Sequence, residues 1–328
     1  MEQAATIIPI AGGKGGIGKS VLAANLAVAL ARMGHETMLV DLDLGASNQH
    51  SMLGLNNRNQ GIGYFLKNRG VRLESLLVPT QWSQLSLVPG ESRTPFAANL
   101  SFAHKAKLLK GLRQLKARYI LLDLGAGASY NTLDFFRVSP HGLVVTATEK
   151  TALMNLQSFL KQLFLRVIER SQRKNRPVLQ LIQNSYAAMN QNDRTDMSQL
   201  LRQIATLDNQ AAERIQTLSR RLQPRVVLNM VRHPDDLVNL KKAGRALENQ
   251  LGIRLDYFGL VFADDAIRTA INNGQPLVAT NPDSIAARGI RRIAEGICED
   301  WQREPDRSGP ELLGYAREFY QEMVEAES

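Results

Sequence analysis

Gly13-Lys-Gly-Gly-Ile-Gly18-Lys19-Ser20 is the stretch that decides the fold of this 328-residue chain. It satisfies the pattern G-x-x-x-x-G-K-[ST], in which glycines let successive backbone N–H groups surround phosphate oxygens. It follows a β-branched run at Thr6–Ile10 and precedes small and apolar residues over Lys19–Met33. These flanks predict a strand before the loop and a buried helix after it. The sequence therefore predicts a phosphate-binding loop at a helix N-terminus, where the helix dipole adds partial positive charge.

Different side chains of the loop serve different purposes. We expect the Lys19 ammonium to neutralise the β- and γ-phosphates of a bound nucleotide and the Ser20 hydroxyl to ligate Mg²⁺. Lys14 is a second lysine that a simple phosphate loop does not require. The residues expected to contact the nucleotide here are Gly13, Lys14, Gly15, Gly16, Ile17, Gly18, Lys19, Ser20 and Val21.

Acidic residues close two later apolar strands. The run Thr37–Asp43 ends in Asp41 and Asp43, and the run Tyr119–Gly125 contains Asp123. At the carboxyl ends of parallel strands such groups face the ligand crevice. Phosphoryl transfer requires charge neutralisation and a positioned nucleophile. We therefore expect one of these carboxylates to hold the Mg²⁺ shell through water and another to orient the attacking water.

The rest of the chain alternates apolar strands with helices. Further strands are predicted at Leu85–Gly90, Gly142–Thr148, Arg225–Val231 and Leu255–Val261, and helices at 103–117, from Thr151 onward, and at about 235–250, 264–273 and 283–300. This alternation predicts an α/β fold with three layers, a doubly wound and mostly parallel sheet with helices on both faces. We expect residues 1–300 to form one domain that carries a mostly helical, basic insertion at about 171–224. Residues 301–328 are expected to form an acidic C-terminal helix.

Composition and charge narrow the class of protein. A single cysteine, Cys298, excludes an intramolecular disulfide and a Cys-x-x-Cys metal or cluster site. No apolar run approaches the ~20 residues of a membrane span, and no signal-peptide pattern opens the chain. We therefore expect a soluble, cytoplasmic protein. The net charge of +9 suggests phosphate-bearing ligands, nucleic acid or anionic membrane as candidate partners.

The charge is unevenly distributed. Between residues 161 and 260 there are 17 basic and nine acidic residues, whereas between 261 and 328 there are seven basic and 13 acidic ones. A basic cluster of Arg166, Arg170, Arg173, Lys174 and Arg176 fits either a solvated helix end or an electrostatic patch for an acidic partner or DNA. An acidic helical face is repelled by anionic lipid. We therefore expect the tail to dock on protein and not to anchor the chain to a membrane.

Together these motifs resemble the ParA/MinD family of deviant-Walker P-loop ATPases. The resemblance rests on five stretches: Gly12–Ser20, Val40–Gly45, Leu121–Gly127, Val227–Arg232 and Asp264–Pro276. It implies the P-loop NTPase fold, ATP/ADP and Mg²⁺ as cofactors, and an ATP-dependent homodimer. Asp41-Leu-Asp43-Leu-Gly45 looks more like MinD and its flagellar relatives FlhG and FleN than like plasmid-partition members.

The resemblance also assigns catalytic roles. Lys14 matches the family's signature lysine, which reaches across the dimer to the partner's phosphates. Asp43 matches the aspartate that orients the attacking water, and Lys19 keeps its phosphate role. The catalytic residues are therefore expected to be Lys14, Lys19 and Asp43.

For the metal and the base the resemblance points to later strands. Asp123 matches the Walker B position and Asp41 is a nearby Mg²⁺-shell candidate, so Ser20, Asp41 and Asp123 are expected to hold the metal. Asn229 matches an adenine-contacting asparagine. The loop around Asp264 is expected to lie near the base.

Two functions from different classes follow. The first is an ATPase that hydrolyses ATP to ADP and phosphate, weakly without a partner, and acts as a homodimer switch to position or count a cellular structure such as a flagellum, a pole or the division apparatus. An activating or effector protein is then expected, with recruitment to a pole, the nucleoid or a membrane-associated complex. The alternative is a ParA-type partition ATPase that binds DNA nonspecifically through the basic central segment, in a strongly salt-sensitive manner.

Overall fold

A single sheet of eight strands organises the part of the chain that the computed structural model describes, residues 5–56, 59–90, 100–190, 197–238, 244, 248, 255–302 and 309–327. The strand order is β3-β4-β2-β5-β1-β6-β7-β8. All neighbours pair in parallel except β3 and β4. The strands are β1 (Thr6–Gly12), β2 (Thr37–Leu42), β3 (Val78–Pro79), β4 (Leu85–Val88), β5 (Tyr119–Leu124), β6 (His141–Thr146), β7 (Gln223–Val231) and β8 (Asp256–Phe262).

The central strands are buried on both faces. Every residue of β2 and β5 is buried, which explains why their sequences are almost continuously apolar: parallel strands are covered by helices on either side. The predicted α/β, doubly wound and mostly parallel fold is confirmed. The antiparallel β3, of two residues, was not predicted because so short an edge strand has no readable alternation.

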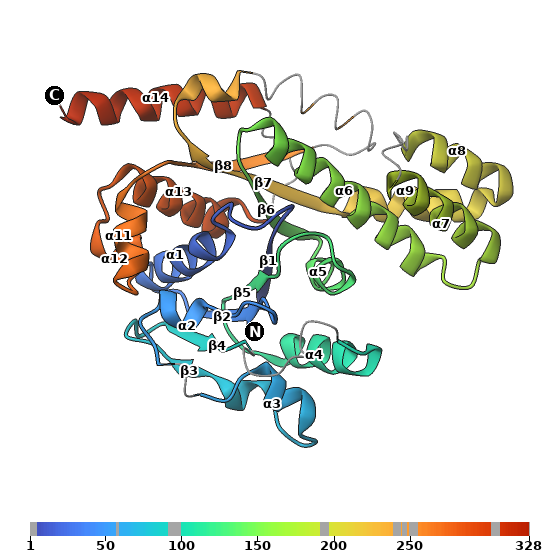
Figure 1. The fold of residues 1–328 in the computed structure, drawn as a ribbon, viewed down its shortest axis with the longest axis horizontal. Coiled ribbons are helices and arrows are strands. Elements are labelled where there is room, and N and C mark those ends of the chain that lie inside the picture. The colour runs from blue at the N-terminus through green and yellow to red at the C-terminus, as the bar shows by residue number, and fades with distance from the viewer. Residues whose placement is uncertain are drawn as a thin grey trace.

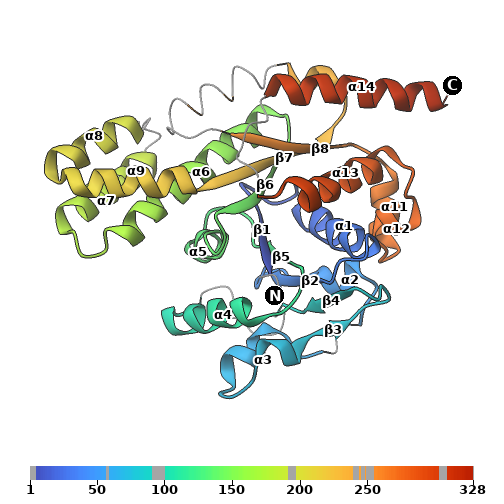
Figure 2. The ribbon, with the colours of Figure 1, turned by 180° about the vertical axis from the view of Figure 1, so that it is seen from behind.

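Helices cover the two faces of the sheet as separate layers (Figures 1 and 2). One layer, packed against Ile8 and Ile10 of β1, contains α1 (Lys19–Arg32), α11 (Ala266–Asn272), α12 (Leu277–Thr280) and α13 (Ile285–Asp300). The other contains α3 (Ile62–Lys67), η1 (Leu73–Leu76), α4 (Phe102–Gln114), α5 (Tyr130–Phe136) and α6 (Lys150–Ser171). The short α2 (Gln49–Met52) lies at the edge of the sheet near α1.

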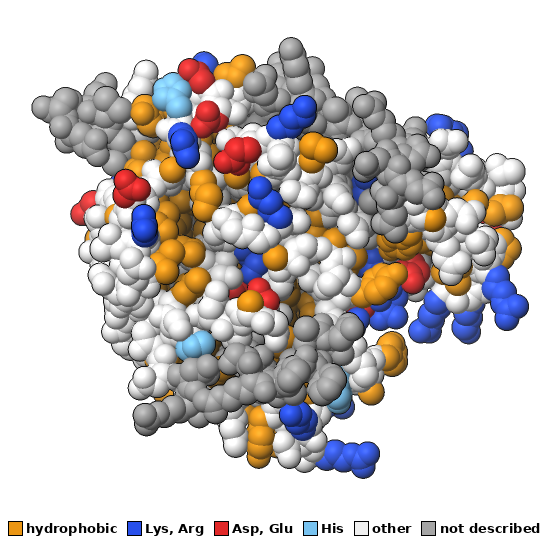
Figure 3. Space-filling model, viewed as in Figure 1, with side chains coloured by type: hydrophobic (Ala, Val, Ile, Leu, Met, Phe, Trp, Pro, Cys, Tyr) orange, Lys and Arg blue, Asp and Glu red, His pale blue; other side chains and the backbone are white. Residues whose placement is uncertain are grey.

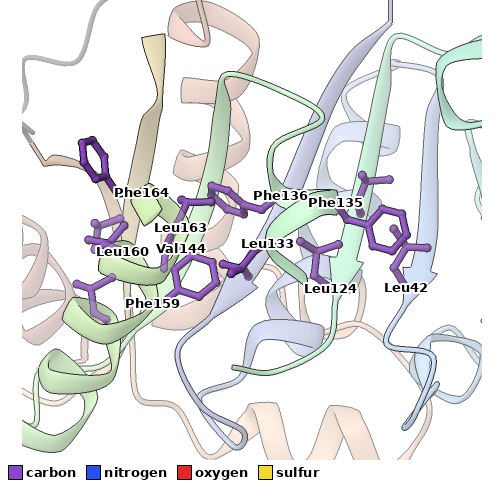
Figure 4. Packing of buried hydrophobic residues seen from close by; sticks show 14 of the residues in the cluster. Leu42, Leu124, Leu133, Phe135, Phe136, Val144, Phe159, Leu160, Leu163 and Phe164 are labelled. Carbon is purple, nitrogen blue, oxygen red and sulfur yellow. The ribbon is translucent and has the colours of Figure 1, made fainter. Parts of the chain in front are cut away.

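Aromatic and aliphatic side chains join α5 and α6 to the sheet. Phe136 and Phe159 meet edge to face with centroids 5.5 Å apart, and Val144 of β6 lies beside them (Figure 4). Such pairs contribute about 0.5–1.5 kcal/mol beyond the area that they bury. These contacts pack α5 and α6 against each other and against the sheet.

Three helices occupy most of the polar segment 171–224 and pack at the end of α6, at the right of Figure 1. They are α7 (Arg176–Asn190), α8 (Met197–Leu207) and α9 (Asn209–Arg221). Their apolar sides contribute Val178, Leu200 and Ile215 to the same core as α6. The description of this segment as an insertion, and the boundary at residue 300, stay predictions.

The predicted helix at 235–250 begins differently from the expectation. Pro234–Leu237 forms a 3-10 turn, η2, because the His233 side chain accepts from a backbone N–H of the turn and the Asp236 carboxylate accepts from the backbone N–H of His233. Gly244 and Glu248 are helical, and the other residues of 239–250 lie outside the described ones.

The acidic tail forms α14 (Gly309–Glu327), which lies along β8 and η2 (Figure 1). Leu312, Ala316 and Phe319 are buried, and the Phe319 ring lies 5.8 Å from that of Phe262. Glu322 pairs with Arg288 at 3.3 Å on the exposed side. The apolar side of α14 is thus covered by the protein itself. Within the described ranges, no helix combines the length and the apolar character needed to cross a bilayer.

Candidate functional site

The glycine-rich loop leaves the end of β1 and enters α1 at Lys19. Gly16 and Gly18 adopt φ of +80° and +77°, which side chains disfavour. A Cβ on Gly18 would lie 2.3 Å from the Asn229 amide nitrogen, and one on Gly13 would lie 2.5 Å from the Asn155 carbonyl oxygen. Glycine is therefore required both for the turn of the loop and for its close packing against β7 and α6.

Lys19 and Asp123 form a buried ion pair at the centre of the site. The Lys19 Nζ atom lies 2.5 Å from Asp123 Oδ1, with side-chain exposures of 6% and 0%. Lys19 also donates to the Ser20 hydroxyl at 3.1 Å. The parallel pairing of β5 with β2 places Asp41 directly beside Asp123. The loop lysine, the hydroxyl and two strand-end carboxylates are thus brought together, as the motif spacing predicted.

Gln49 completes this network and was missed by the sequence reasoning. Its side-chain nitrogen donates to Asp123 Oδ2 at 2.6 Å and to the Ser20 carbonyl at 3.0 Å. The residue is fully buried. A lone glutamine carries no motif signal. Only the fold shows that Gln49, at the start of α2, links the segment after β2 to Ser20 and Asp123.

Asp41 organises the loop that follows β2. Its carboxylate accepts from the Ser47 hydroxyl at 2.8 Å and from the backbone N–H groups of Asp43, Asn48 and Gln49 at 3.1 Å each. Burial, together with the neighbouring Asp123 carboxylate, raises the pKa of Asp41 to about 7. Asp41 therefore fixes the course of residues 43–49 around the site, while its place in the Mg²⁺ shell stays a prediction.

Asp43 is half-buried at the mouth of the same loop. Its Oδ1 lies 3.5 Å from the position of a Cβ on Gly125, so the carboxylate faces the small-residue loop after β5. Burial raises the pKa of Asp43, and Lys19 partly opposes the rise. Asp43 is a half-exposed carboxylate between Lys19 and the small-residue loop after β5. Such a carboxylate can align a water molecule or accept a proton from it.

Lys14 has a different environment from Lys19. It is half-exposed in the loop, and no ion pair joins it to a carboxylate among the residues that the structure describes. Its charge is therefore presented at the surface beside the site. The catalytic role predicted for Lys14 needs such an outward position, because the expected target lies on a second copy.

Asn229 and Asp264, the residues expected near the base, have backbone partners. The Asn229 side chain donates to the Ile17 carbonyl at 2.8 Å and anchors the phosphate loop from β7. The Asp264 carboxylate accepts from Ala266 N at 2.9 Å and from Ala286 N at 3.3 Å. The first bond positions the phosphate loop, and the other two position the segment that follows β8. Contact with the base stays a prediction for both residues.

The donor set suits Mg²⁺ and a phosphate chain. Ser20, Asp41 and Asp123 supply hydroxyl and carboxylate oxygens, the ligands that Mg²⁺ prefers. Asn48 Oδ1 and Gln49 Oε1 are buried with no hydrogen-bond partner. Because buried polar atoms are nearly always paired, these two oxygens indicate that a water or ligand group belongs beside them.

The basic cluster predicted around residue 170 is only partly a surface patch. Arg166 is buried, with an exposure of 8%, and forms two hydrogen bonds to Asp134, at 2.7 and 2.8 Å. Arg170 also turns toward Asp134. The interpretation as a surface patch is wrong for Arg166, because the carboxylate of Asp134, 32 residues away in the sequence, binds its side chain. Arg173, Lys174, Arg176 and Arg214 instead line an open cavity of about 740 Å³.

Comparison with known proteins gives consistent results. A family model described as the CobQ/CobB/MinD/ParA nucleotide binding domain matches residues 8–277. The antiactivator FleN of Pseudomonas aeruginosa is 24% identical over 298 residues, which are 90% of this chain and 86% of that protein. The flagellum site-determining protein YlxH of Helicobacter pylori is 29% identical over 47% of this chain and 52% of that protein.

Other relatives align over about half of this chain. A putative septum site-determining protein MinD of Tupiella akineta is 32% identical over 153 residues, 46% of this chain and 50% of that protein. The chain spans about half the length of the MinD relatives that it matches. Among solved structures, Pyrococcus horikoshii MinD complexed with Mg-ADP superposes with a TM-score of 0.59 at 19% identity, covering 91% of this chain and 98% of that one.

Proposed function

The chain belongs to the CobQ/CobB/MinD/ParA nucleotide-binding family, and on that premise we propose that it is a MinD/ParA-like ATPase that hydrolyses ATP to ADP and phosphate and serves in positioning or number control of a cellular structure. The observation that carries the proposal is the buried pair of Lys19 and Asp123 behind the glycine-rich loop. The similarity to YlxH, described as a flagellum site-determining protein, and to the antiactivator FleN supports the cellular role.

The residues of the chain divide the work of hydrolysis. Backbone N–H groups of the loop and the Lys19 ammonium bind the phosphates and neutralise their charge. Ser20, Asp41 and Asp123 would hold Mg²⁺, which supplies further neutralisation of the β- and γ-oxygens. Asp43 orients the attacking water and accepts a hydrogen bond from it. We expect weak turnover by the chain alone, with an activating partner protein that raises it.

A homodimer switch completes the proposal. Lys14 is a half-exposed residue of the loop without a described carboxylate partner, which supports a role in contacting the phosphates of a second copy. ATP would then close the dimer and hydrolysis would open it. The loop after β5 is linked to this event because the Gly127 N–H donates to the Gly12 carbonyl at 2.9 Å.

The experiment is light scattering with and without ATP, combined with phosphate release. Wild type and Asp43→Ala should dimerise with ATP, with hydrolysis lost in the variant. Lys19→Ala should fail to bind nucleotide, and Lys14→Ala should bind it but stay monomeric. If Asp43→Ala binds ATP and remains a monomer, the switch is wrong although the nucleotide site stands.

A second candidate is ATP-dependent, nonspecific DNA binding. The cavity lined by Arg173, Lys174, Arg176 and Arg214 favours it, because all four cations surround one opening. DNA affinity should then fall by about 10³-fold or more between 50 and 200 mM salt if six phosphates are contacted. No mobility shift at 50 mM salt with ATP would remove this candidate.

A further inference from the structure

Asp134, on α5, gathers cations from three helices. Its carboxylate binds Arg166 of α6 at 2.7 and 2.8 Å and Lys105 of α4 at 2.8 Å. Arg137 and Arg170 approach it at 3.6 Å. Asp134 itself is 4% exposed, so one buried carboxylate binds two basic side chains directly and attracts two more.

The charges of this cluster do not balance. Glu169, bound to Arg166 at 2.8 Å, is the second carboxylate in the cluster, which leaves a surplus of two positive charges. At 3.6 Å, Arg137 and Arg170 lie beyond hydrogen-bond distance of Asp134, and their side chains are 27% and 33% exposed. Both guanidinium groups are therefore attracted by Asp134 without a hydrogen bond to it, and both remain partly exposed.

Two exposed aromatic rings adjoin these guanidinium groups. Phe102 is 71% exposed and Tyr130 is 55% exposed. The Arg170 Cζ atom lies 5.8 Å from the Phe102 centroid, and the Arg166 Cζ atom lies 4.4 Å from the Tyr130 centroid. We call Phe102, Tyr130, Arg137 and Arg170 the α4–α5–α6 surface, and the buried Arg166 lies beneath it. In Figure 3, hydrophobic and basic side chains adjoin one another on that side of the body, beside the lobe of α7 to α9.

We propose that the α4–α5–α6 surface docks an acidic peptide segment of a partner protein that also carries apolar side chains. Tyr, Phe and Arg are enriched in the energetically dominant centres of protein interfaces. Carboxylates of the segment would bind Arg137 and Arg170, with the bidentate geometry that guanidinium groups favour. Apolar side chains of the segment would cover Phe102 and Tyr130.

The geometry favours a peptide over nucleic acid. Asp134 already orders the guanidinium groups, so binding costs little side-chain entropy and rewards one defined arrangement of carboxylates. A nucleic-acid backbone is instead followed by several cations along a groove, and the cations that line one opening are those of the cavity with Arg173 and Lys174. The surface excludes the phosphate loop, so the inference does not depend on ATP hydrolysis.

The test is fluorescence anisotropy with a labelled 12-residue peptide, (Glu-Glu-Leu)₄, at 50 mM salt. Comparison probes are (Glu-Glu-Ser)₄, which lacks apolar side chains, (Lys-Lys-Leu)₄, which reverses the charge, and a 20-nucleotide oligo-dT. Variants are Phe102→Ala, Arg170→Glu and the milder Arg170→Gln. The control is Arg268→Glu, which makes the same change of charge at an exposed residue of α11, in the opposite helix layer. Thermal unfolding checks that each variant folds.

The expected result is binding of (Glu-Glu-Leu)₄ that weakens at least about fivefold in Phe102→Ala and about tenfold in Arg170→Glu. Arg170→Gln should weaken binding by a factor between those of Phe102→Ala and Arg170→Glu. Arg268→Glu should bind the peptide within about twofold of wild type. The proposal is overturned by no saturable binding of (Glu-Glu-Leu)₄, by equal binding of (Glu-Glu-Ser)₄, or by variants that bind as wild type. Displacement of the peptide by oligo-dT, with Arg170→Glu also losing oligo-dT, would assign the surface to nucleic acid and equally overturn it.

Discussion

Lys19 Nζ lies 2.5 Å from Asp123 Oδ1, and both side chains are buried. The cation that the loop offers to a phosphate is thus already bound by the carboxylate at the end of β5. A phosphate group that approaches Lys19 without a metal meets the negative charge of Asp123 as well. From this relationship we predict that nucleotide affinity depends on Mg²⁺, which would restore the balance of charge.

The first prediction follows from that pair. Asp123→Asn removes the carboxylate that repels the phosphates, so ADP affinity measured by calorimetry in EDTA should rise or stay constant. The gain in affinity on adding Mg²⁺, expected to be large in wild type, should be lost. Without nucleotide the variant should be less stable by about 3 kcal/mol, because Lys19 stays buried and unpaired.

Asp43→Asn is the matched control for this prediction. Asp43 is a carboxylate of the same site but is half-buried and has no ion pair with Lys19. Its neutralisation should leave the Mg²⁺ effect on ADP affinity within about threefold of wild type. An Asp123→Asn variant that keeps the full Mg²⁺ effect would contradict the assignment of Asp123 to the metal.

The second prediction concerns Asn229, whose amide holds the Ile17 carbonyl at 2.8 Å. If the main role of Asn229 is this bond, Asn229→Ala should loosen the phosphate loop. The affinities for ATP and for inorganic triphosphate should then fall by the same factor. A lost hydrogen bond of about 0.5–1.5 kcal/mol corresponds to roughly 2–12-fold. Competition binding with both ligands checks this. A loss for ATP with no loss for triphosphate would instead show that Asn229 contacts the base.

The central part of the fold could be read from the sequence because its signals are local. The glycine-rich loop, the buried strands β2 and β5, and the carboxylates that end them follow from motif spacing and from continuous apolar runs. Parallel pairing then forces Asp41 and Asp123 together, since the carboxyl ends of neighbouring strands share one edge. The position of Lys19 beside them follows from the same motif, because the loop that carries it leaves the end of β1.

The parts that could not be predicted depend on contacts between distant residues. Gln49 is polar and begins the short helix α2, and only the folded chain places it between Ser20 and Asp123. Arg166 belonged to a basic cluster by sequence, yet Asp134 binds it across a helix interface. Such pairings carry no periodic or spacing signal that a single sequence reveals.

The third prediction compares two glycines of the phosphate loop. Gly18→Ala forces a side chain onto φ +77° and toward the Asn229 amide at 2.3 Å, so it should destabilise the protein and weaken ADP binding. A Cβ on Gly15 meets nothing within 4 Å, so Gly15→Ala should change the free energy of unfolding by less than about 1 kcal/mol. Urea unfolding of both variants measures this. Equal destabilisation by the two substitutions would show that the loop geometry is misassigned.

The fourth prediction uses the buried carboxylate of α5. Burial by itself disfavours the charged form of Asp134, but hydrogen bonds and charge from Arg166 and Lys105 outweigh it and lower the pKa. A group whose pKa is lower in the folded protein stabilises it above its unfolded pKa, about 3.9, and loses that contribution as the pH falls through the folded value.

Asp134→Asn should therefore lower the free energy of unfolding by about 3 kcal/mol at pH 7, because Arg166 and Lys105 stay buried without their carboxylate. The difference from wild type should shrink below about pH 4, as wild-type Asp134 itself becomes protonated. Urea unfolding at pH 7, 5 and 3.5 measures both effects. Glu74→Gln, which breaks the exposed pair with Arg72, should cost less than about 0.5 kcal/mol at every pH. A difference between Asp134→Asn and wild type that stays constant down to pH 3.5 would mean that the packing of α5 against α6, and not the charge of Asp134, supplies the stability.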